Sequence, residues 1–75
     1  MFLIGNMSLS SAKDFGARLR GKRKALGVTQ KDLAMASGTG LRFIIDLEKG
    51  KPSCRIGKAL AVAQALGLNV ELRDV

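Results

Sequence analysis

The chain has 75 residues, enough for one small domain, and carries a formal net charge of +7, with 13 Lys and Arg against 6 Asp and Glu. With no histidine and one cysteine, Cys54, it shows no recognisable zinc or haem site, no internal disulfide and no Ser/His/Asp or Cys/His catalytic set. We therefore expect no cofactor, no metal and no enzyme activity. The basic balance favours a polyanionic partner such as nucleic acid or acidic lipid, and the cysteine usage fits a reducing cytoplasm.

Residues 1–8 are expected to form a flexible N-terminus. Their opening, "MFLIGNM", is too short an apolar run for a signal peptide and lacks the basic start of one, and Met7 is an alternative initiator. The chain holds no stretch of about 18 consecutive apolar residues, so the sequence predicts no membrane span.

From Ser11 onward, apolar residues recur with the period of a helix. Four helices are expected, between residues 11 and 27, 29 and 38, 39 and 49, and 55 and 67. Ser11, Thr29 and Thr39 have the side chains that cap the start of a helix, and Gly27 and Gly38 suit the left-handed conformation that ends one.

After the fourth helix the period changes from 3.6 to 2, because Leu68, Val70 and Leu72 alternate with polar residues. This predicts a strand over residues 68–75, following a helical domain over residues 9–67. No second strand is evident, and an unpaired strand leaves backbone groups unsatisfied. We therefore expect these three residues to form a dimerisation strand that pairs with a second copy of the chain. The alternative is a frayed tail of the fourth helix.

The second and third helices, joined by "ASGT", have the spacing of a helix-turn-helix. With Gln30 as the first position, Ala34 is the fifth, Gly38 the ninth, Ile44 the fifteenth and Leu47 the eighteenth. The small Ala34 allows the helices to cross closely, and Gly38 accepts the positive φ of a tight turn. Ile44 and Leu47 would pack the second of the two helices against the first.

Around this helix-turn-helix, the chain resembles a known family. The stretch "RLRGKRKALGVTQKDLA…GTGLRFIIDLEKGKPS" resembles the XRE/Cro-C1-type helix-turn-helix domains of bacterial and phage repressors, and "RFIIDLEKGKPSCRIGKALAVAQALGLNVEL" is similar to antitoxins of the HipB type, including their Y4mF-like relatives. The resemblance covers roughly Phe15 to the C-terminus. It implies an all-α, four-helix lambda-repressor-like domain whose short C-terminal β-strand pairs across a homodimer. It also implies repression of its own operon and a complex with a HipA-type kinase toxin.

The resemblance further implies which residues read DNA bases: Gly40, Leu41, Arg42, Ile45 and Asp46. Arg42 can donate two hydrogen bonds to a guanine, and Leu41 or Ile45 can meet a thymine methyl, whereas Gly40 offers only backbone. Direct readout would be sparse, with phosphate contacts and DNA shape contributing more. Alternatively, Arg42 and Asp46 are four residues apart and pair with each other on a solvated face.

A second group of residues is expected to contact DNA phosphates: Arg23, Gln30, Lys31, Thr39, Lys49, Lys51 and Arg55. Arg23 and Glu48 match a family pair that forms a partly buried salt bridge between the first and third helices, so both are interpreted as mainly structural. Gln30 matches a phosphate-anchoring position at the start of the second helix. A run of charged residues is usually a solvated face, but the run of Lys49, Lys51, Arg55 and Lys58 flanks the expected recognition helix.

The sequence thus predicts a sequence-specific repressor that binds double-stranded DNA as a homodimer, on a pseudo-palindromic operator. It is expected to be cytoplasmic, and associated with the nucleoid when bound to DNA, with no membrane partner. Two alternatives stay open. One is a toxin-docking module with weak DNA readout, favoured by the apolar "LRFII". The other is a stand-alone, phage-type repressor without a toxin.

Overall fold

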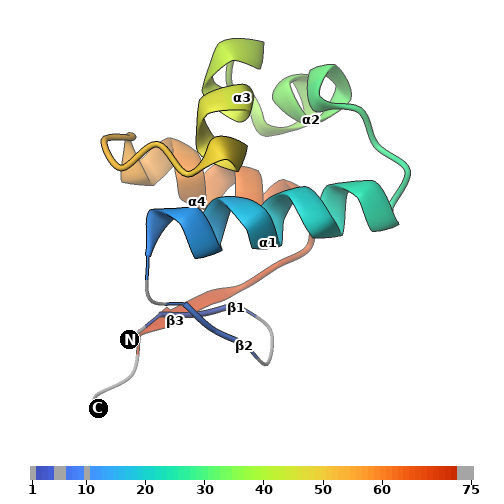
Figure 1. Cartoon of the computed structure of the whole chain (residues 1–75). Helices are drawn as coiled ribbons and strands as arrows, with labels where there is room; N and C mark the ends of the chain where they lie inside the picture. The colour runs from blue at the N-terminus through green and yellow to red at the C-terminus, as the bar shows by residue number, and fades with distance from the viewer. Residues whose placement is uncertain (1, 5–6, 10, 73–75) are drawn as a thin grey trace.

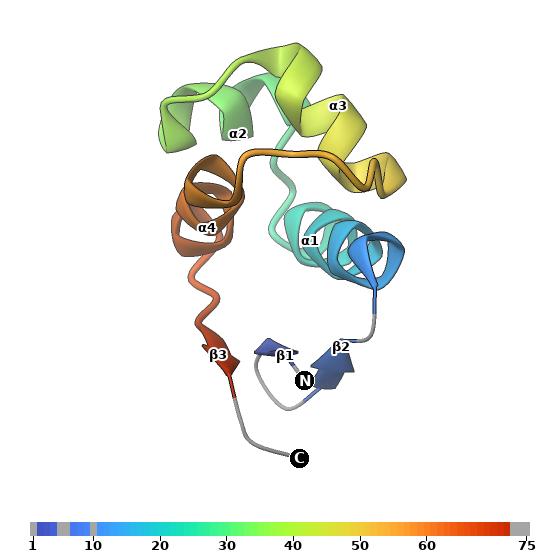
Figure 2. The same ribbon diagram turned by 90° about the vertical axis from the view of Figure 1, so that its left-hand side faces the viewer.

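Four helices and three short strands make up the part of the chain that the computed structural model describes, residues 2–4, 7–9 and 11–72. In chain order they are β1 (Phe2–Ile4), β2 (Met7–Leu9), α1 (Ala12–Ala25), α2 (Gln30–Ser37), α3 (Leu41–Lys49), α4 (Ile56–Ala65) and β3 (Val70–Leu72). The expected four helices and short C-terminal strand are confirmed. Helices α1 and α4 lie between the sheet and the α2–α3 pair (Figures 1 and 2). None of the helices within these ranges is long and apolar enough to cross a membrane.

Two of the predicted helix caps are confirmed. The hydroxyls of Ser11 and Thr29 each accept a hydrogen bond from the backbone amide three residues later, at 3.1 Å and 3.0 Å. Gly27 and Gly38 have φ values of 70° and 69°, in the left-handed region where a side chain would be strained. The chain therefore turns sharply after α1 and after α2, at the two glycines expected from the sequence.

The predicted cap of α3 is wrong by one residue. The N-cap is Gly40, and it makes no side-chain cap hydrogen bond. Thr39 belongs to the end of α2, because its amide donates to the carbonyl of Ala34 at 3.0 Å. Its hydroxyl lies 2.9 Å from the Ser37 hydroxyl. The turn at Gly38 thus takes up Thr39, and α3 begins with exposed backbone rather than a capping side chain.

The core forms where the four helices meet. Each contributes one large, fully buried side chain: Leu19 from α1, Leu33 from α2, Ile44 from α3 and Val62 from α4. They are surrounded by six further buried apolar residues, Ala34, Leu47, Ala59, Ala63, Leu66 and Leu68. Of the residues that define the helix-turn-helix spacing, Ala34, Ile44 and Leu47 are therefore core residues, whereas Gly38 forms the exposed turn.

The expectation that the chain lacks a second strand is wrong. Strands β1, β2 and β3 form an antiparallel sheet in the order β2-β1-β3, and β3 pairs with β1 in the register Phe2↔Leu72 and Ile4↔Val70. Strands β1 and β2 both come from the N-terminal segment. Residues 1–8 of this segment were expected to be flexible, and of these, residues 1, 5 and 6 lie outside the described residues. The backbone groups of β3 on the β1 side are thus satisfied within one chain.

The three residues assigned to the dimerisation strand have different environments. Leu68 is 8% exposed and belongs to the core, Val70 is half-buried against that core, and Leu72 is 72% exposed. Because β1 is the central strand, β3 has a second edge that carries no partner among the described strands. Pairing of that edge with a second copy stays a prediction.

Gly16 brings the backbones of α1 and α3 close together, and sequence reasoning did not single it out. A Cβ added at Gly16 would overlap the carbonyl oxygen of Leu47 and lie 2.9 Å from that of Glu48. Backbone atoms cannot move aside as a flexible side chain can. Gly21, one and a half turns further along α1, is exposed, and a Cβ there meets nothing within 4 Å.

We predict that Gly16→Ala lowers the free energy of unfolding by about 1–3 kcal/mol, because the added methyl group forces α3 away from α1. Gly21→Ala is the matched control, and it should raise the stability by about 0.5–1 kcal/mol through helix propensity alone. Urea denaturation followed by circular dichroism measures both. Equal stability of the two variants would contradict the close approach of the helices.

Candidate nucleic-acid interface

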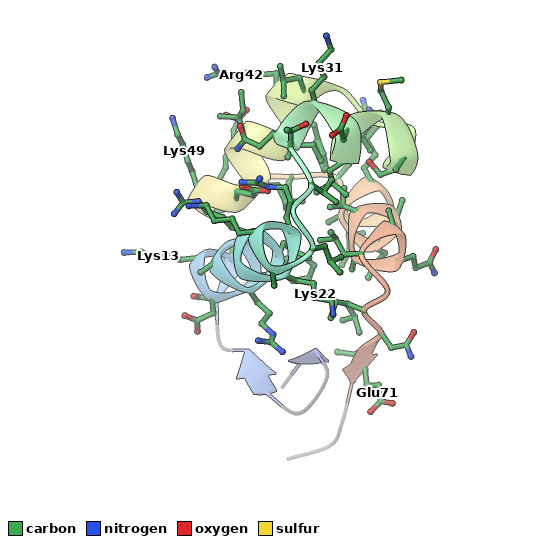
Figure 3. All side chains as sticks on the ribbon, turned by 90° about the vertical axis from the view of Figure 1, so that its right-hand side faces the viewer. Lys13, Lys22, Lys31, Arg42, Lys49 and Glu71 are labelled. Carbon is green, nitrogen blue, oxygen red and sulfur yellow. The ribbon has the colours of Figure 1, made fainter. Side chains whose placement is uncertain are left out.

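Helix α3 has a buried side and an exposed side. Ile44 and Leu47 face the core, whereas Arg42 projects outward with 81% of its side chain exposed. Figure 3 shows Arg42 and Lys31 pointing away from the rest of the protein at the end formed by α2 and α3. A helix that is anchored on one side and exposed on the other has the geometry needed to enter a DNA groove.

The predicted base-reading residues lie along this outer side. Gly40, Leu41 and Arg42 are exposed, with Leu41 at 44%, and Ile45 and Asp46 are half-buried. The start of α3 therefore exposes one arginine, one aliphatic side chain and the backbone of Gly40 on this outer side. Ile45, one turn further, adds a second aliphatic surface. None of these residues is among the buried residues of the core.

Arg42 and Asp46 form the ion pair considered as an alternative from the sequence, and Asp46 has a second partner. Nε of Arg42 lies 3.4 Å from Oδ1 of Asp46, and Nζ of Lys51 lies 3.7 Å from Oδ2. The second contact was not predicted. It arises because the chain turns back at Gly50, and the amide of Lys51 donates to the Asp46 carbonyl at 3.1 Å.

The predicted salt bridge between Arg23 and Glu48 is present and buried. Nε and Nη2 of Arg23 donate to Oε2 and Oε1 of Glu48 at 2.7 Å and 3.0 Å, and Nη1 donates to the Val28 carbonyl at 2.8 Å. The hydrogen bonds to Glu48 raise the pKa of Arg23 above its ordinary value, although burial acts in the opposite direction. Arg23 is 8% exposed, so its role in the structure is to join α1 to α3.

Gln30, expected at a phosphate, donates from Nε2 to Oε1 of Glu48 at 3.2 Å. Glu48 therefore accepts hydrogen bonds from α1 and from the start of α2 at the same time. The amide of Gln30 is half-buried and has a second N–H donor, which this bond leaves available. The sequence indicated the Arg23–Glu48 pair but not this third member.

Exposed cations surround the outer side of α3. Lys31 lies in the first turn of α2, Lys49 ends α3, and Lys51 and Arg55 lie in the following connection. Lys51 and Arg55 line an open depression at the side of α3, together with Lys58. Lys51 and Arg55 were both predicted as phosphate contacts, and the structure places them together along this depression.

Lys58 and Lys13 also belong to this surface. Nζ of Lys58 lies 5.8 Å from the centre of the Phe43 ring, which is a cation–π contact between α4 and α3. Lys13 projects on the same side as Lys49 (Figure 3). The turn at Gly50 explains this, because a Cβ there would lie 2.6 Å from the Lys13 Cα.

The fold, with α2 and α3 joined by a tight turn and packed on α1 and α4, is that of a helix-turn-helix protein. Residues 14–75 match the family model described as a helix-turn-helix domain. The chain is also 45% identical over 64 residues, 85% of its own length and 84% of the relative's, to the protein named "Uncharacterized HTH-type transcriptional regulator y4mF" of Sinorhizobium fredii (strain NBRC 101917 / NGR234). The chain therefore belongs to the helix-turn-helix domain family.

We predict that Glu48→Ala lowers the free energy of unfolding by about 3–5 kcal/mol, because it leaves the Arg23 charge buried without a partner. Asp32→Ala, at an exposed position in the first turn of α2, should cost only about 0.3–1 kcal/mol. The double variant R23M/E48L should recover most of the loss, since it removes both charges together. Urea denaturation measures all three. A loss in E48A no larger than that in D32A would contradict a structural role for the pair.

Proposed function

We propose that the chain is a sequence-specific, DNA-binding transcription regulator whose helix α3 enters the major groove of double-stranded DNA. One observation carries this proposal. The side of α3 opposite to Ile44 and Leu47 presents an arginine that is 81% exposed, on the end of the molecule where Lys31 also projects (Figure 3). A net charge of +7 supplies the attraction to phosphates that binding of this kind requires.

In this proposal Arg42 makes the main base contact, with a guanine. Its Nη1 and Nη2 groups make no hydrogen bond within the described part of the chain and match the O6 and N7 acceptors of that base. Leu41 and Ile45 contact thymine methyl groups, and Gly40 contributes only its backbone. Direct recognition of bases therefore rests on three side chains only. The shape and deformability of the DNA then contribute the rest of the specificity.

The phosphate contacts come from residues on both sides of α3. Lys31 and the free N–H of Gln30 lie at the start of α2, Lys49 ends α3, and Lys51 and Arg55 follow it along the chain. α4 begins at Ile56 without a side-chain cap, so its first amides are available to a phosphate as well. Arg23 is left out of this proposed set, because three of its donors are committed to Glu48 and to Val28. Thr39 is retained as a minor contact.

We further propose that two copies associate through the outer edge of β3, antiparallel about a two-fold axis. Two observations support this proposal. The sheet order leaves that edge of β3 without a partner among the described strands, and Leu72 on β3 is 72% exposed. A symmetric dimer would read a pseudo-palindromic operator whose half-sites lie about one helical turn, or a multiple of it, apart.

The finer assignment is a repressor of its own operon that acts as a HipB-like antitoxin and binds a HipA-type kinase toxin. It is supported by the resemblance of the segment from Arg42 to Leu72, and the relative's printed name supports transcription regulation alone. Co-expression with the product of an adjoining kinase-like gene, followed by size-exclusion chromatography, tests it. Separate elution of the two proteins, or the lack of such a gene, would leave a stand-alone repressor.

We predict that Arg42→Ala loses about 1–3 kcal/mol of discrimination between the DNA upstream of its own gene and unrelated DNA in a band-shift assay. If a dimer makes roughly 6–10 phosphate contacts, wild-type affinity should fall about 10³–10⁵-fold between 50 and 200 mM salt. Lys22→Ala is the charge-matched control, because Lys22 lies on the side of α1 toward the sheet (Figure 3). A flat salt response, or equal losses in R42A and K22A, would argue strongly against this interface.

We predict that Leu72→Lys shifts the chain from dimer to monomer in analytical ultracentrifugation, because it adds a positive charge to the pairing edge of each copy. Leu26→Lys introduces the same charge at another exposed leucine, 52% accessible at the end of α1, and should leave the dimer intact. Circular dichroism checks that both variants keep their helices. A dimer unchanged in L72K would place the interface elsewhere.

A further inference from the structure

Asp46 places a carboxylate among the cations on the outer side of α3. Its two oxygens are divided between two partners, with Oδ1 3.4 Å from Nε of Arg42 and Oδ2 3.7 Å from Nζ of Lys51. The Asp46 side chain is 23% exposed, against 81% for Arg42 and 53% for Lys51. The carboxylate is therefore the inner member of this triplet, and both cations extend beyond it.

The backbone builds this arrangement. Gly50 adopts a φ of 85° at the end of α3, and the chain then turns back so that the amide of Lys51 donates to the Asp46 carbonyl at 3.1 Å. This brings the start of the Lys51 side chain back beside Asp46. Arg42 lies one helical turn before Asp46, where i and i+4 side chains meet. The carboxylate thus meets one cation through helix geometry and the other through the turn.

Folding stability does not account for an acidic residue at this position. Ion pairs with partners this exposed contribute little, and an arginine that precedes its acid by four residues has the less favourable order for a helix. On a surface that approaches phosphates, a carboxylate also opposes binding. Its effect on the two cations is the remaining physical consequence.

We propose that Asp46 is a positioning residue that holds Arg42 for base readout and Lys51 for a backbone phosphate, and that it contacts no base itself. This inference rests on the proposed function. Each carboxylate oxygen already faces a cation, which leaves neither directed at a base donor. The contact through Nε leaves the four N–H donors on Nη1 and Nη2 of Arg42 available for guanine.

A consequence of this arrangement is specificity gained at the expense of affinity. An untethered arginine can turn to any phosphate within reach, whereas Arg42 held by Asp46 keeps its outer donors directed away from α3. The negative charge also weakens the attraction of this surface to DNA of any sequence. Removal of the charge should therefore strengthen binding to unrelated DNA and weaken the preference for the operator.

The test is Asp46→Asn, which preserves shape and removes the charge, with Asp32→Asn as the matched control. Asp32 is exposed in the first turn of α2 and forms no ion pair among the described residues. The probes are duplexes that the wild-type chain selects from a random pool, and scrambled duplexes of equal length. In fluorescence anisotropy at constant salt, the selected-to-scrambled affinity ratio should fall about three- to fivefold in D46N, as expected for loss of an exposed ion pair. It should stay within about twofold of wild type in D32N.

A second arm separates positioning from direct readout. In an R42A background, D46N should change the ratio no further, because Asp46 acts through Arg42. A further loss in that background would show that Asp46 reads a base and would overturn the proposal. An unchanged ratio in D46N, or an equal fall in D32N, overturns it too while the proposed function stands. Failure of the wild-type chain to enrich any sequence would overturn both.

Discussion

The buried ion pair between Arg23 and Glu48 determines where helix α3 can lie. A charge buried without a partner costs about 3–5 kcal/mol, so α3 must place Glu48 against Arg23. Arg23 also donates to the Val28 carbonyl in the segment before α2, and Gln30 donates to Glu48 from the start of α2. One carboxylate thus relates α1, α2 and α3 to one another. The outward direction of Arg42 follows from this constraint, because it is on the same rigid helix.

The close backbone contact at Gly16 reinforces this placement. The ion pair sets the position of α3 along α1, and the missing side chain at Gly16 allows the two backbones to approach. Leu19, one turn further along α1, is fully buried in the core that Ile44 enters from α3. Polar, steric and apolar contacts along one side of α1 therefore all specify the same position of α3. A chain of 75 residues has few other contacts to rely on.

The sequence predicted the features that depend on local spacing. Four residue types at the spacing of Ala34, Gly38, Ile44 and Leu47 gave the helix-turn-helix, because each has a local steric reason. The caps at Ser11 and Thr29 have the same origin. Thr39 was misassigned because two residues beside a glycine turn compete to start the next helix, and boundaries of this kind depend on geometry that spacing does not encode.

Features that depend on contacts between distant residues were missed. The pairing of β1 with β3 joins the two ends of the chain, and the short β1 segment carries too few residues to show a period. Gly16 is one of 9 glycines, and only the crossing of α1 with α3 distinguishes it from Gly21. The contact of Lys51 with Asp46 depends on the turn at Gly50. In the candidate site, the sequence therefore identified the residue types and the face, and the structure added their partners.

The sheet and the recognition helix are also related geometrically. All four helices lie on one side of the sheet, with α2 and α3 furthest from it (Figures 1 and 2). Two identical edge strands that pair antiparallel are related by a two-fold axis perpendicular to the sheet. Pairing through the outer edge of β3 would therefore extend the sheet and keep both sets of helices on the same side. Both α3 helices would then face one DNA duplex together, whereas packing the two sheets face to face would direct them apart.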